Sequence, residues 1–80
     1  MAENPIRVMI VDDHPLARAG LATFLLAYDD LLLVAEAASG EEALRRAPQA
    51  CPDVVLMDMA LPGMDGAEAI AALRTLCPGV

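Results

Sequence analysis

The 80-residue sequence contains no lysine and no tryptophan, and it has only one tyrosine, one phenylalanine and one histidine. All five basic residues are arginines, against 12 acidic residues, so the net charge is −7. Proteins that grip a nucleic-acid backbone gather Lys and Arg on one face. The scattered arginines therefore argue against direct nucleic-acid binding by this chain and favour a cation or a basic partner.

Long hydrophobic runs and a secretion signal are also lacking. A membrane-spanning helix needs about 20 consecutive apolar residues, and every apolar run here is far shorter. The amino terminus has no basic segment followed by an apolar one. Cys51 and Cys77 have neither C-x-x-C nor Cys/His metal spacing, so we interpret them as buried, reduced thiols. We expect a soluble, cytoplasmic protein with no membrane partner.

The residues that are present form one domain with strands and helices in alternation. Apolar runs predict strands over residues 6–11, 31–37 and 54–57. Helical spacing predicts a first helix from Pro15 to about Tyr28, and capping boxes at 39–42 and 65–68 begin two more. This βαβαβα order predicts an α/β fold, with a doubly wound parallel sheet and right-handed crossovers.

Some details of burial follow from the pattern. The second strand contains Glu36 within an apolar run, which indicates an edge strand. The third strand, residues 54–57, shows no alternation, which is typical of a strand covered on both faces. The first helix is expected to bury an apolar stripe formed by Ala17, Leu21, Phe24, Leu25 and Tyr28.

Carboxylates follow the first and third strands. Asp12 and Asp13 come directly after the first strand, and Asp58 directly after the third. If the first strand is central, the strand order reverses beside it, and the three carboxylates emerge together at the edge where α/β sheets bind ligands. Helix capping explains the Asp12-Asp13 pair alone, but it does not explain the joint placement of all three.

Three carboxylates in one crevice repel one another. Two unit charges about 4 Å apart repel by about 4 kcal/mol at an effective dielectric constant of about 20. A hard divalent cation relieves this repulsion, and Mg²⁺ prefers oxygen ligands. The placement therefore predicts a Mg²⁺ site in which Asp58 is poised as a nucleophile toward a phosphoryl group. His14, just before Pro15, is interpreted as a loop residue without a role.

The motifs resemble those of the response regulator receiver domain of bacterial two-component signalling. Residues 10–15, Ile-Val-Asp-Asp-His-Pro, match its acidic-pair motif. Residues 54–58 with 62–66 match its phosphoacceptor motif. The resemblance covers essentially the whole chain and implies a flavodoxin-like, CheY-like fold. It also implies that Asp58 accepts a phosphoryl group from a histidine kinase, and that Asp12 or Asp13, with Asp58 and the backbone carbonyl of Met59, holds Mg²⁺.

The Asp-Asp-His-Pro form resembles the LuxR/NarL-type subgroup, whose members carry a C-terminal helix-turn-helix domain. This implies that the full-length protein controls transcription. Receivers of this family have five strands and five helices, with a switch Ser/Thr after the fourth strand and a lysine after the fifth. We therefore expect residues 1–80 to be the N-terminal portion of a receiver, with the fourth and fifth βα units and any effector domain absent.

The third strand would be central in the complete family fold. Without a fourth strand its outer edge is open, and one alternate pair, Val54 with Leu56 or Val55 with Met57, is expected to meet water. We therefore expect a homodimer or larger assembly through Val54 to Met57, or else partial unfolding.

Two alternatives to the signalling phosphoacceptor stay open. The first is a Mg²⁺-dependent phosphohydrolase with an aspartyl nucleophile, but such enzymes resemble an Asp-x-Asp pattern and here the second position is Ala60. The second is a module that docks a kinase without being phosphorylated. The favoured interpretation is a phosphoacceptor domain that is not an enzyme.

Overall fold

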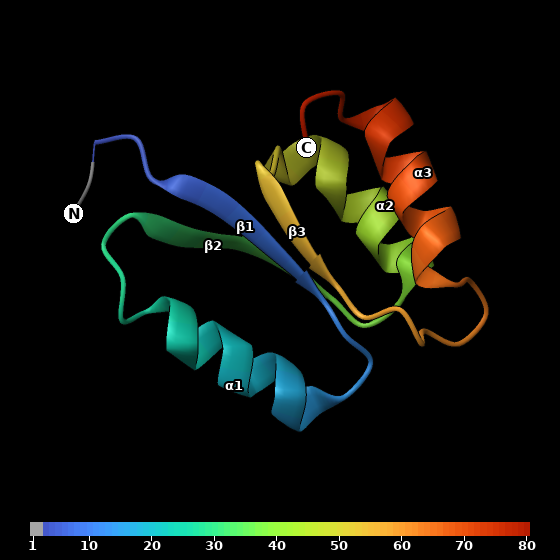
Figure 1. The fold of residues 1–80 in the computed structure, drawn as a ribbon, viewed down its shortest axis with the longest axis horizontal. Coiled ribbons are helices and arrows are strands. Elements are labelled where there is room, and N and C mark those ends of the chain that lie inside the picture. The colour runs from blue at the N-terminus through green and yellow to red at the C-terminus, as the bar shows by residue number, and fades with distance from the viewer. Residues whose placement is uncertain (1–2) are drawn as a thin grey trace.

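Six elements alternate along residues 3–80, which are the residues that the computed structural model describes. They are β1 (Ile6–Val11), α1 (Pro15–Leu25), β2 (Leu31–Ala37), α2 (Gly40–Ala50), β3 (Val54–Met57) and α3 (Gly66–Leu76). The three strands are parallel in the order β2-β1-β3, so β1 is central. Helix α1 lies on one face of the sheet and α2 and α3 on the other (Figure 1). The predicted doubly wound α/β fold is confirmed.

The core has one apolar cluster on each face of β1. Because side chains alternate along a strand, Met9 and Val11 face α2 and α3, whereas Val8 and Ile10 face α1. All four side chains are almost fully buried. A strand with both faces buried reads as a continuous apolar run, which is how the sequence of β1 reads.

The N-cap half of each capping box predicted for α2 and α3 is present. Ser39 Oγ accepts a hydrogen bond from the Glu42 N–H at 3.1 Å, and Asp65 Oδ1 accepts one from the Glu68 N–H at 2.8 Å. The Glu42 carboxylate accepts from the N–H of Ala38, one residue before the cap. That hydrogen bond is the main reason why the pKa of Glu42 is lowered. Both helices therefore begin where local side chains satisfy their first N–H groups.

The predicted end of α1 is wrong. The helix ends at Leu25, because the N–H groups of residues 26–28 bond to carbonyls three residues back instead of four. The chain thus leaves α1 through tighter turns before it reaches β2.

The buried face predicted for α1 is also wrong in part. Leu21 and Leu25 do pack on the sheet, with Ala22 beside them. Ala17 is exposed, and Phe24 and Tyr28 remain 58% and 46% exposed. These two rings contact each other instead, with centroids 5.3 Å apart. The contact face is set by the residues that meet Val8 and Ile10, which the helical period alone does not identify.

The prediction that β3 is covered on both faces is wrong for the described residues. Val54 and Leu56 are 42% and 38% exposed, while Val55 and Met57 are half-buried. Val54 and Leu56 pair with Val8 and Ile10 of β1, so they share the face that α1 covers. Within residues 3–80, β3 has β1 as its one neighbouring strand. The expectation that one alternate pair meets water is therefore confirmed.

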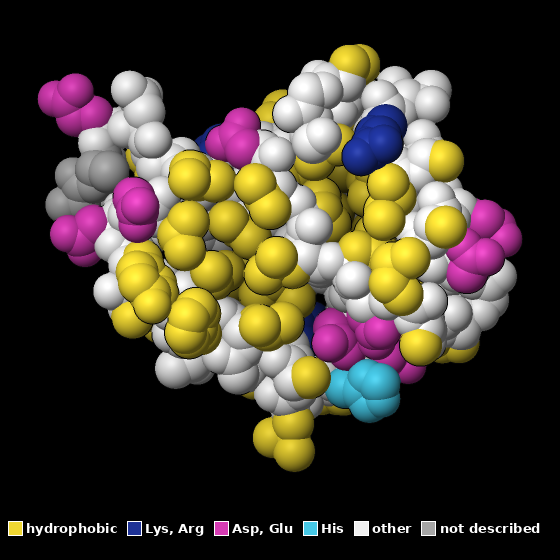
Figure 2. Space-filling model, viewed as in Figure 1, with side chains coloured by type: hydrophobic (Ala, Val, Ile, Leu, Met, Phe, Trp, Pro, Cys, Tyr) yellow, Lys and Arg dark blue, Asp and Glu magenta, His cyan; other side chains and the backbone are white. Residues whose placement is uncertain are grey.

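Figure 2 shows hydrophobic side chains gathered over the part of the surface where the strands and α1 lie in Figure 1. In the described part of the chain, no helix is long and apolar enough to cross a membrane. Cys51 and Cys77 are both free thiols, as expected, but the expected burial is wrong, since Cys51 is exposed and Cys77 is partly exposed.

Arg7 connects the start of β1 to the end of α2 and the start of β3. Its guanidinium donates hydrogen bonds to the carbonyls of Ala50 at 2.6 Å and Cys51 at 3.2 Å. Its N–H donates to Asp53 Oδ2 at 2.9 Å, and its carbonyl accepts from the Asp53 N–H at 2.8 Å. The last carbonyls of a helix have no partner within the helix and favour a nearby cation. Arg7 thus stabilises the end of α2 from the neighbouring strand.

Replacing Arg7 by methionine is expected to lower the free energy of unfolding by about 1–2 kcal/mol, because the helix carbonyls lose a charged donor. Urea unfolding followed by circular dichroism measures this change. The matched control is Arg45→Met, at an exposed arginine on α2, for which we expect a change of less than about 0.5 kcal/mol. Equal unfolding midpoints for the two variants would contradict this role of Arg7.

Candidate functional site

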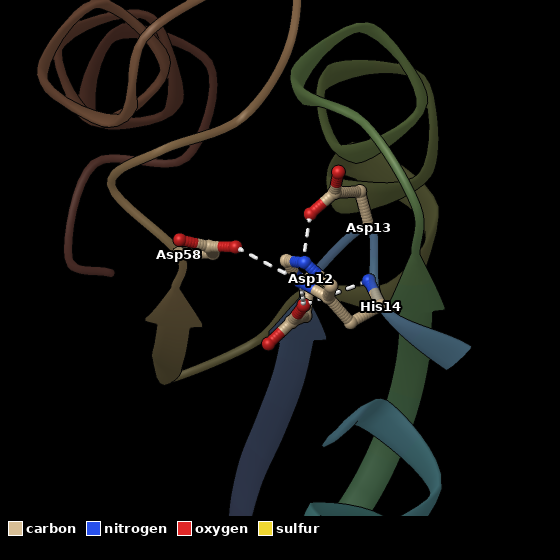
Figure 3. A group of neighbouring side chains, drawn as sticks. All are labelled: Asp12, Asp13, His14 and Asp58. Carbon is tan, nitrogen blue, oxygen red and sulfur yellow. Dashed lines mark hydrogen bonds and ion pairs between the residues drawn. The ribbon is translucent and has the colours of Figure 1, made fainter. Parts of the chain in front are cut away.

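Hydrogen bonds of the sheet position the predicted acidic residues at one edge. The Asp12 N–H donates to the carbonyl of Ala37 at 3.0 Å, and the Asp58 N–H donates to that of Val11 at 2.9 Å. Each aspartate thus extends the hydrogen-bond ladder by one residue beyond its strand. Both side chains leave the backbone at the carboxyl ends of β1 and β3 and point toward each other (Figure 3).

Four side chains meet at this edge. One potential ligand atom from each of Asp12, Asp13, His14 and Asp58 lies within 4.8 Å of the others. The three carboxylates are mostly shielded, with side chains 16%, 29% and 20% exposed, whereas His14 is 69% exposed. The structure thus brings together the three carboxylates that the sequence pattern placed at one edge.

The carboxylate of Asp58 is held by its own loop. Oδ1 accepts a hydrogen bond from the Ala60 N–H at 2.9 Å, and Oδ2 faces His14 Nδ1 at 3.8 Å. A pocket lies beside it, lined by Val11, Asp12, Leu21, Leu56, Met57 and Asp58. One oxygen of Asp58 is therefore fixed by the backbone, while the other faces the acidic cluster.

Met59 follows Asp58 and is 57% exposed. The start of α3 packs closely on its backbone: a Cβ atom on Gly66 would lie 2.8 Å from the Cα of Met59 and 3.2 Å from the carbonyl oxygen of Asp58. Glycine at position 66 therefore allows α3 to begin directly against this loop. In the same loop, Gly63 has φ of +84°, a backbone conformation that favours glycine.

Asp12 has the most hydrogen bonds of the three carboxylates. Its Oδ1 accepts from the N–H of His14 at 2.9 Å and contacts His14 Nδ1 at 3.0 Å. The backbone hydrogen bond is the main reason why the pKa of Asp12 is lowered, and partial burial opposes it. Arg18 also holds this loop, since its Nη1 donates to the Asp12 carbonyl at 2.8 Å and its Nε lies 3.3 Å from Glu36 Oε1.

Asp13 is the least satisfied. Its Oδ1 is shielded from solvent and has no hydrogen bond within residues 3–80. His14 Nδ1 lies 3.1 Å away, but a ring nitrogen carries at most one hydrogen, and its hydrogen-bond contact is with Asp12. The contact with Asp13 is therefore one of charge. A shielded carboxylate oxygen without a donor is costly, and a hard cation would satisfy it. This oxygen and the all-carboxylate donor set fit Mg²⁺.

His14 is the residue that the sequence analysis missed. Its Nδ1 lies among the three carboxylates, at 3.0 Å from Asp12, 3.1 Å from Asp13 and 3.8 Å from Asp58. The signal in the sequence was its place directly after the acidic pair, as the chain's one histidine. The hydrogen bond with Asp12 raises the pKa of His14 most, followed by the charge of Asp13.

A titration of His14 by NMR tests this arrangement. We expect its pKa to lie above the usual histidine value and to fall toward it in Asp12→Asn, because the principal hydrogen bond is lost. The matched control is Asp29→Asn, which removes the same charge from the exposed turn before β2 and should leave the pKa unchanged.

A raised pKa also has a consequence for stability. The charge contacts of His14 stabilise the folded protein fully below the pKa of the unfolded chain, and this contribution is lost as the pH rises through the folded pKa. A His14 pKa at the usual value in the wild type would contradict the observed geometry.

Comparisons with known proteins identify the family and the fold. The chain matches the response regulator receiver domain over residues 8–80. It is 50% identical over 64 residues to the transcriptional regulatory protein LiaR of Bacillus subtilis, covering 80% of this chain and 30% of LiaR. The chain spans about a third of the length of the curated relatives that it matches.

Solved structures of receiver domains have the same fold as this chain. The response regulator domain of Thermotoga maritima CheB superposes with a TM-score of 0.88 at 33% identity, over 94% of this chain and 56% of that one. The receiver domain of NarL from Mycobacterium tuberculosis gives 0.83 at 42% identity, over 90% of this chain and 58% of that one. With its acidic pair after β1 and its aspartate after β3, the chain belongs to the response regulator receiver domain family, and LuxR/NarL-type regulators are among its relatives.

Proposed function

We propose that Asp58 accepts a phosphoryl group from a histidine kinase. The observation that supports this most is the placement of its carboxylate, with Oδ1 held by the Ala60 N–H and Oδ2 facing the acidic cluster beside an open pocket. Membership of the receiver family supports a phosphoacceptor role in signalling. The position two residues after Asp58 is Ala60, which has no acid for a leaving group, so a phosphohydrolase is not favoured.

In the proposed reaction, a carboxylate oxygen of Asp58 attacks the phosphorus atom of a phosphohistidine. The new bond is P–O, the P–N bond breaks, and the imidazole leaves with the electron pair and takes up a proton. The product is an aspartyl phosphate, a mixed anhydride. Because the nucleophile and the phosphoryl group are both anionic, their approach requires positive charge at this edge of the sheet.

We propose Mg²⁺ as the source of that charge, held by Asp12 or Asp13 with Asp58 and the backbone carbonyl of Met59. When bound, it neutralises charge on the phosphoryl oxygens in the transition state. The protein contributes the geometry: the ladder hydrogen bonds fix Asp12 and Asp58, Arg18 holds the loop after β1, and Asp13 offers an oxygen that no donor satisfies.

Residues 1–80 are, in this proposal, the N-terminal portion of the receiver of a longer cytoplasmic regulator that controls transcription. LiaR, half identical over the matched region, is a transcriptional regulatory protein. The solved receivers extend beyond the matched part, since this chain covers 56–58% of them. With a net charge of −7, this chain is unsuited to touch DNA itself, so DNA binding is assigned to another part of the regulator.

Incubation with acetyl phosphate and Mg²⁺ should place one phosphoryl group on Asp58, slowly, as an acid-stable and base-labile adduct found by mass spectrometry. Asp58→Asn should abolish labelling, and Asp13→Asn should slow it by roughly tenfold or more, because a charge that positions the cation is lost. Asp65→Asn is the matched control, because Asp65 caps α3 outside the cluster. Labelling at another residue, or a chain that takes no label in Mg²⁺, would refute the proposal.

We also propose that the chain associates through β3. One edge of β3 carries unpaired backbone groups in the described structure, and Val54 and Leu56 beside it are half-exposed. An open apolar edge strand favours pairing with another strand. A second copy of β3 would supply such a strand and cover these side chains.

Sedimentation equilibrium should therefore show a dimer or larger assembly, and Leu56→Glu should shift it toward monomer, because a charge at the edge opposes strand pairing. Leu26→Glu is the matched control, since Leu26 is 83% exposed at the end of α1 and lies outside β3. A wild-type chain that stays a compact, cooperatively melting monomer at high concentration would exclude this assembly.

A further inference from the structure

The imidazole of His14 lies at the point where the three carboxylates converge. Its Nδ1 is 3.0 Å from an oxygen of Asp12, 3.1 Å from one of Asp13 and 3.8 Å from one of Asp58. Figure 3 shows the ring between the ends of β1 and β3, with contacts to all three acids. A cation that binds these same oxygens must come within about 2.1 Å of them if it is Mg²⁺. The ring nitrogen and such a cation therefore exclude each other.

The ring itself is loosely held. The side chain of His14 is 69% exposed, and although His14 is the N-cap residue of α1, its side chain makes no cap hydrogen bond. The polar contacts of the ring described above are those of Nδ1 with the three aspartates. The ring can therefore leave the cluster without disturbing the apolar core.

The backbone at His14 has a separate attachment. Its N–H donates to Asp12 Oδ1 at 2.9 Å, its carbonyl accepts from the Arg18 N–H in the first turn of α1, and Pro15 fixes the start of that helix. These contacts do not involve the ring. The loop after β1 thus keeps its form while the side chain of His14 moves.

We propose that the ring of His14 occupies the cation position of the acidic cluster and has to be displaced when a divalent cation binds. This inference rests on the proposed Mg²⁺ site and adds a residue that opposes binding there. By donating into the cluster, His14 reduces the repulsion among the carboxylates and keeps them close together. By the same contacts it lowers the affinity of the cluster for the metal.

A second role for the same ring predicts the opposite result. An imidazole nitrogen is a good ligand for transition metals, and a liganding His14 would strengthen binding instead of opposing it. Affinity measurements on variants of His14 distinguish the two roles by their sign.

The experiment is a calorimetric titration of the 80-residue chain with MgCl₂. We expect His14→Ala to bind Mg²⁺ roughly two- to fivefold more tightly than the wild type, as suits the loss of an exposed charge contact. His14→Gln keeps a side-chain N–H donor and should fall between the two. Leu16→Ala, at an 89% exposed position in the first turn of α1, is the matched control and should equal the wild type.

A second measurement needs no variant. In the wild type, saturating Mg²⁺ should break the hydrogen bond from His14 Nδ1 to Asp12, and the ¹⁵N resonance of that ring nitrogen should move to the position of a solvated imidazole. If His14 affected Mg²⁺ affinity only through its charge, the ring would stay in place when Mg²⁺ binds. An unchanged ¹⁵N resonance at saturating Mg²⁺ would therefore overturn the proposal.

The remaining outcomes are also decisive. Weaker Mg²⁺ binding by His14→Ala would make the residue a ligand, and unchanged binding would show that it does not compete; either overturns the inference but leaves the Mg²⁺ site intact. If the wild type does not bind Mg²⁺ but His14→Ala does, the inference is supported in its strongest form. If neither binds, the proposed Mg²⁺ site and the inference both fail.

Discussion

The repulsion among three carboxylates at one edge of the sheet is the constraint on which this site depends. Asp12 and Asp58 are brought there by the ladder hydrogen bonds that extend β1 and β3. These bonds belong to the sheet, so the backbones of Asp12 and Asp58 cannot separate without breaking strand pairing. Hydrogen-bond donors placed around the carboxylates must offset this repulsion. The central position of β1, buried on both faces, is what makes this arrangement stable.

The donors come from residues close in sequence to the acids they serve. The Asp58 carboxylate accepts a hydrogen bond from the N–H of Ala60. The Asp12 carboxylate accepts one from the N–H of His14 and is also hydrogen-bonded to the His14 ring. Arg18 reaches the Asp12 carbonyl from the first turns of α1. Turn geometry supplies these contacts at short range, and within residues 3–80 they leave one oxygen of Asp13 without a hydrogen bond. The loop therefore holds the carboxylates together and leaves one oxygen for the cation that we propose.

The features predicted well from sequence were those set by strong local or periodic signals. The apolar runs gave the strand bounds, the capping boxes gave the starts of α2 and α3, and strand order then placed Asp58 beside Asp12. Features that depend on which neighbouring residues a helix or strand packs against were predicted poorly. Phe24 has helical spacing, yet its ring packs on Tyr28, because Leu21 and Leu25 take the contact with the sheet. The role of His14 depends on a ring orientation, which no periodic pattern encodes.

The apolar and acidic features of the molecule meet at one pocket. Leu56, from the exposed face of β3, and Leu21, from α1, line the same pocket as Asp12 and Asp58. Leu56 is also half-exposed at the edge where we propose that a second copy pairs. A strand added to β3 would cover this wall and narrow the approach to Asp58. Because this pocket borders the proposed phosphoacceptor Asp58, the proposed assembly and the proposed chemistry are linked through the end of β3.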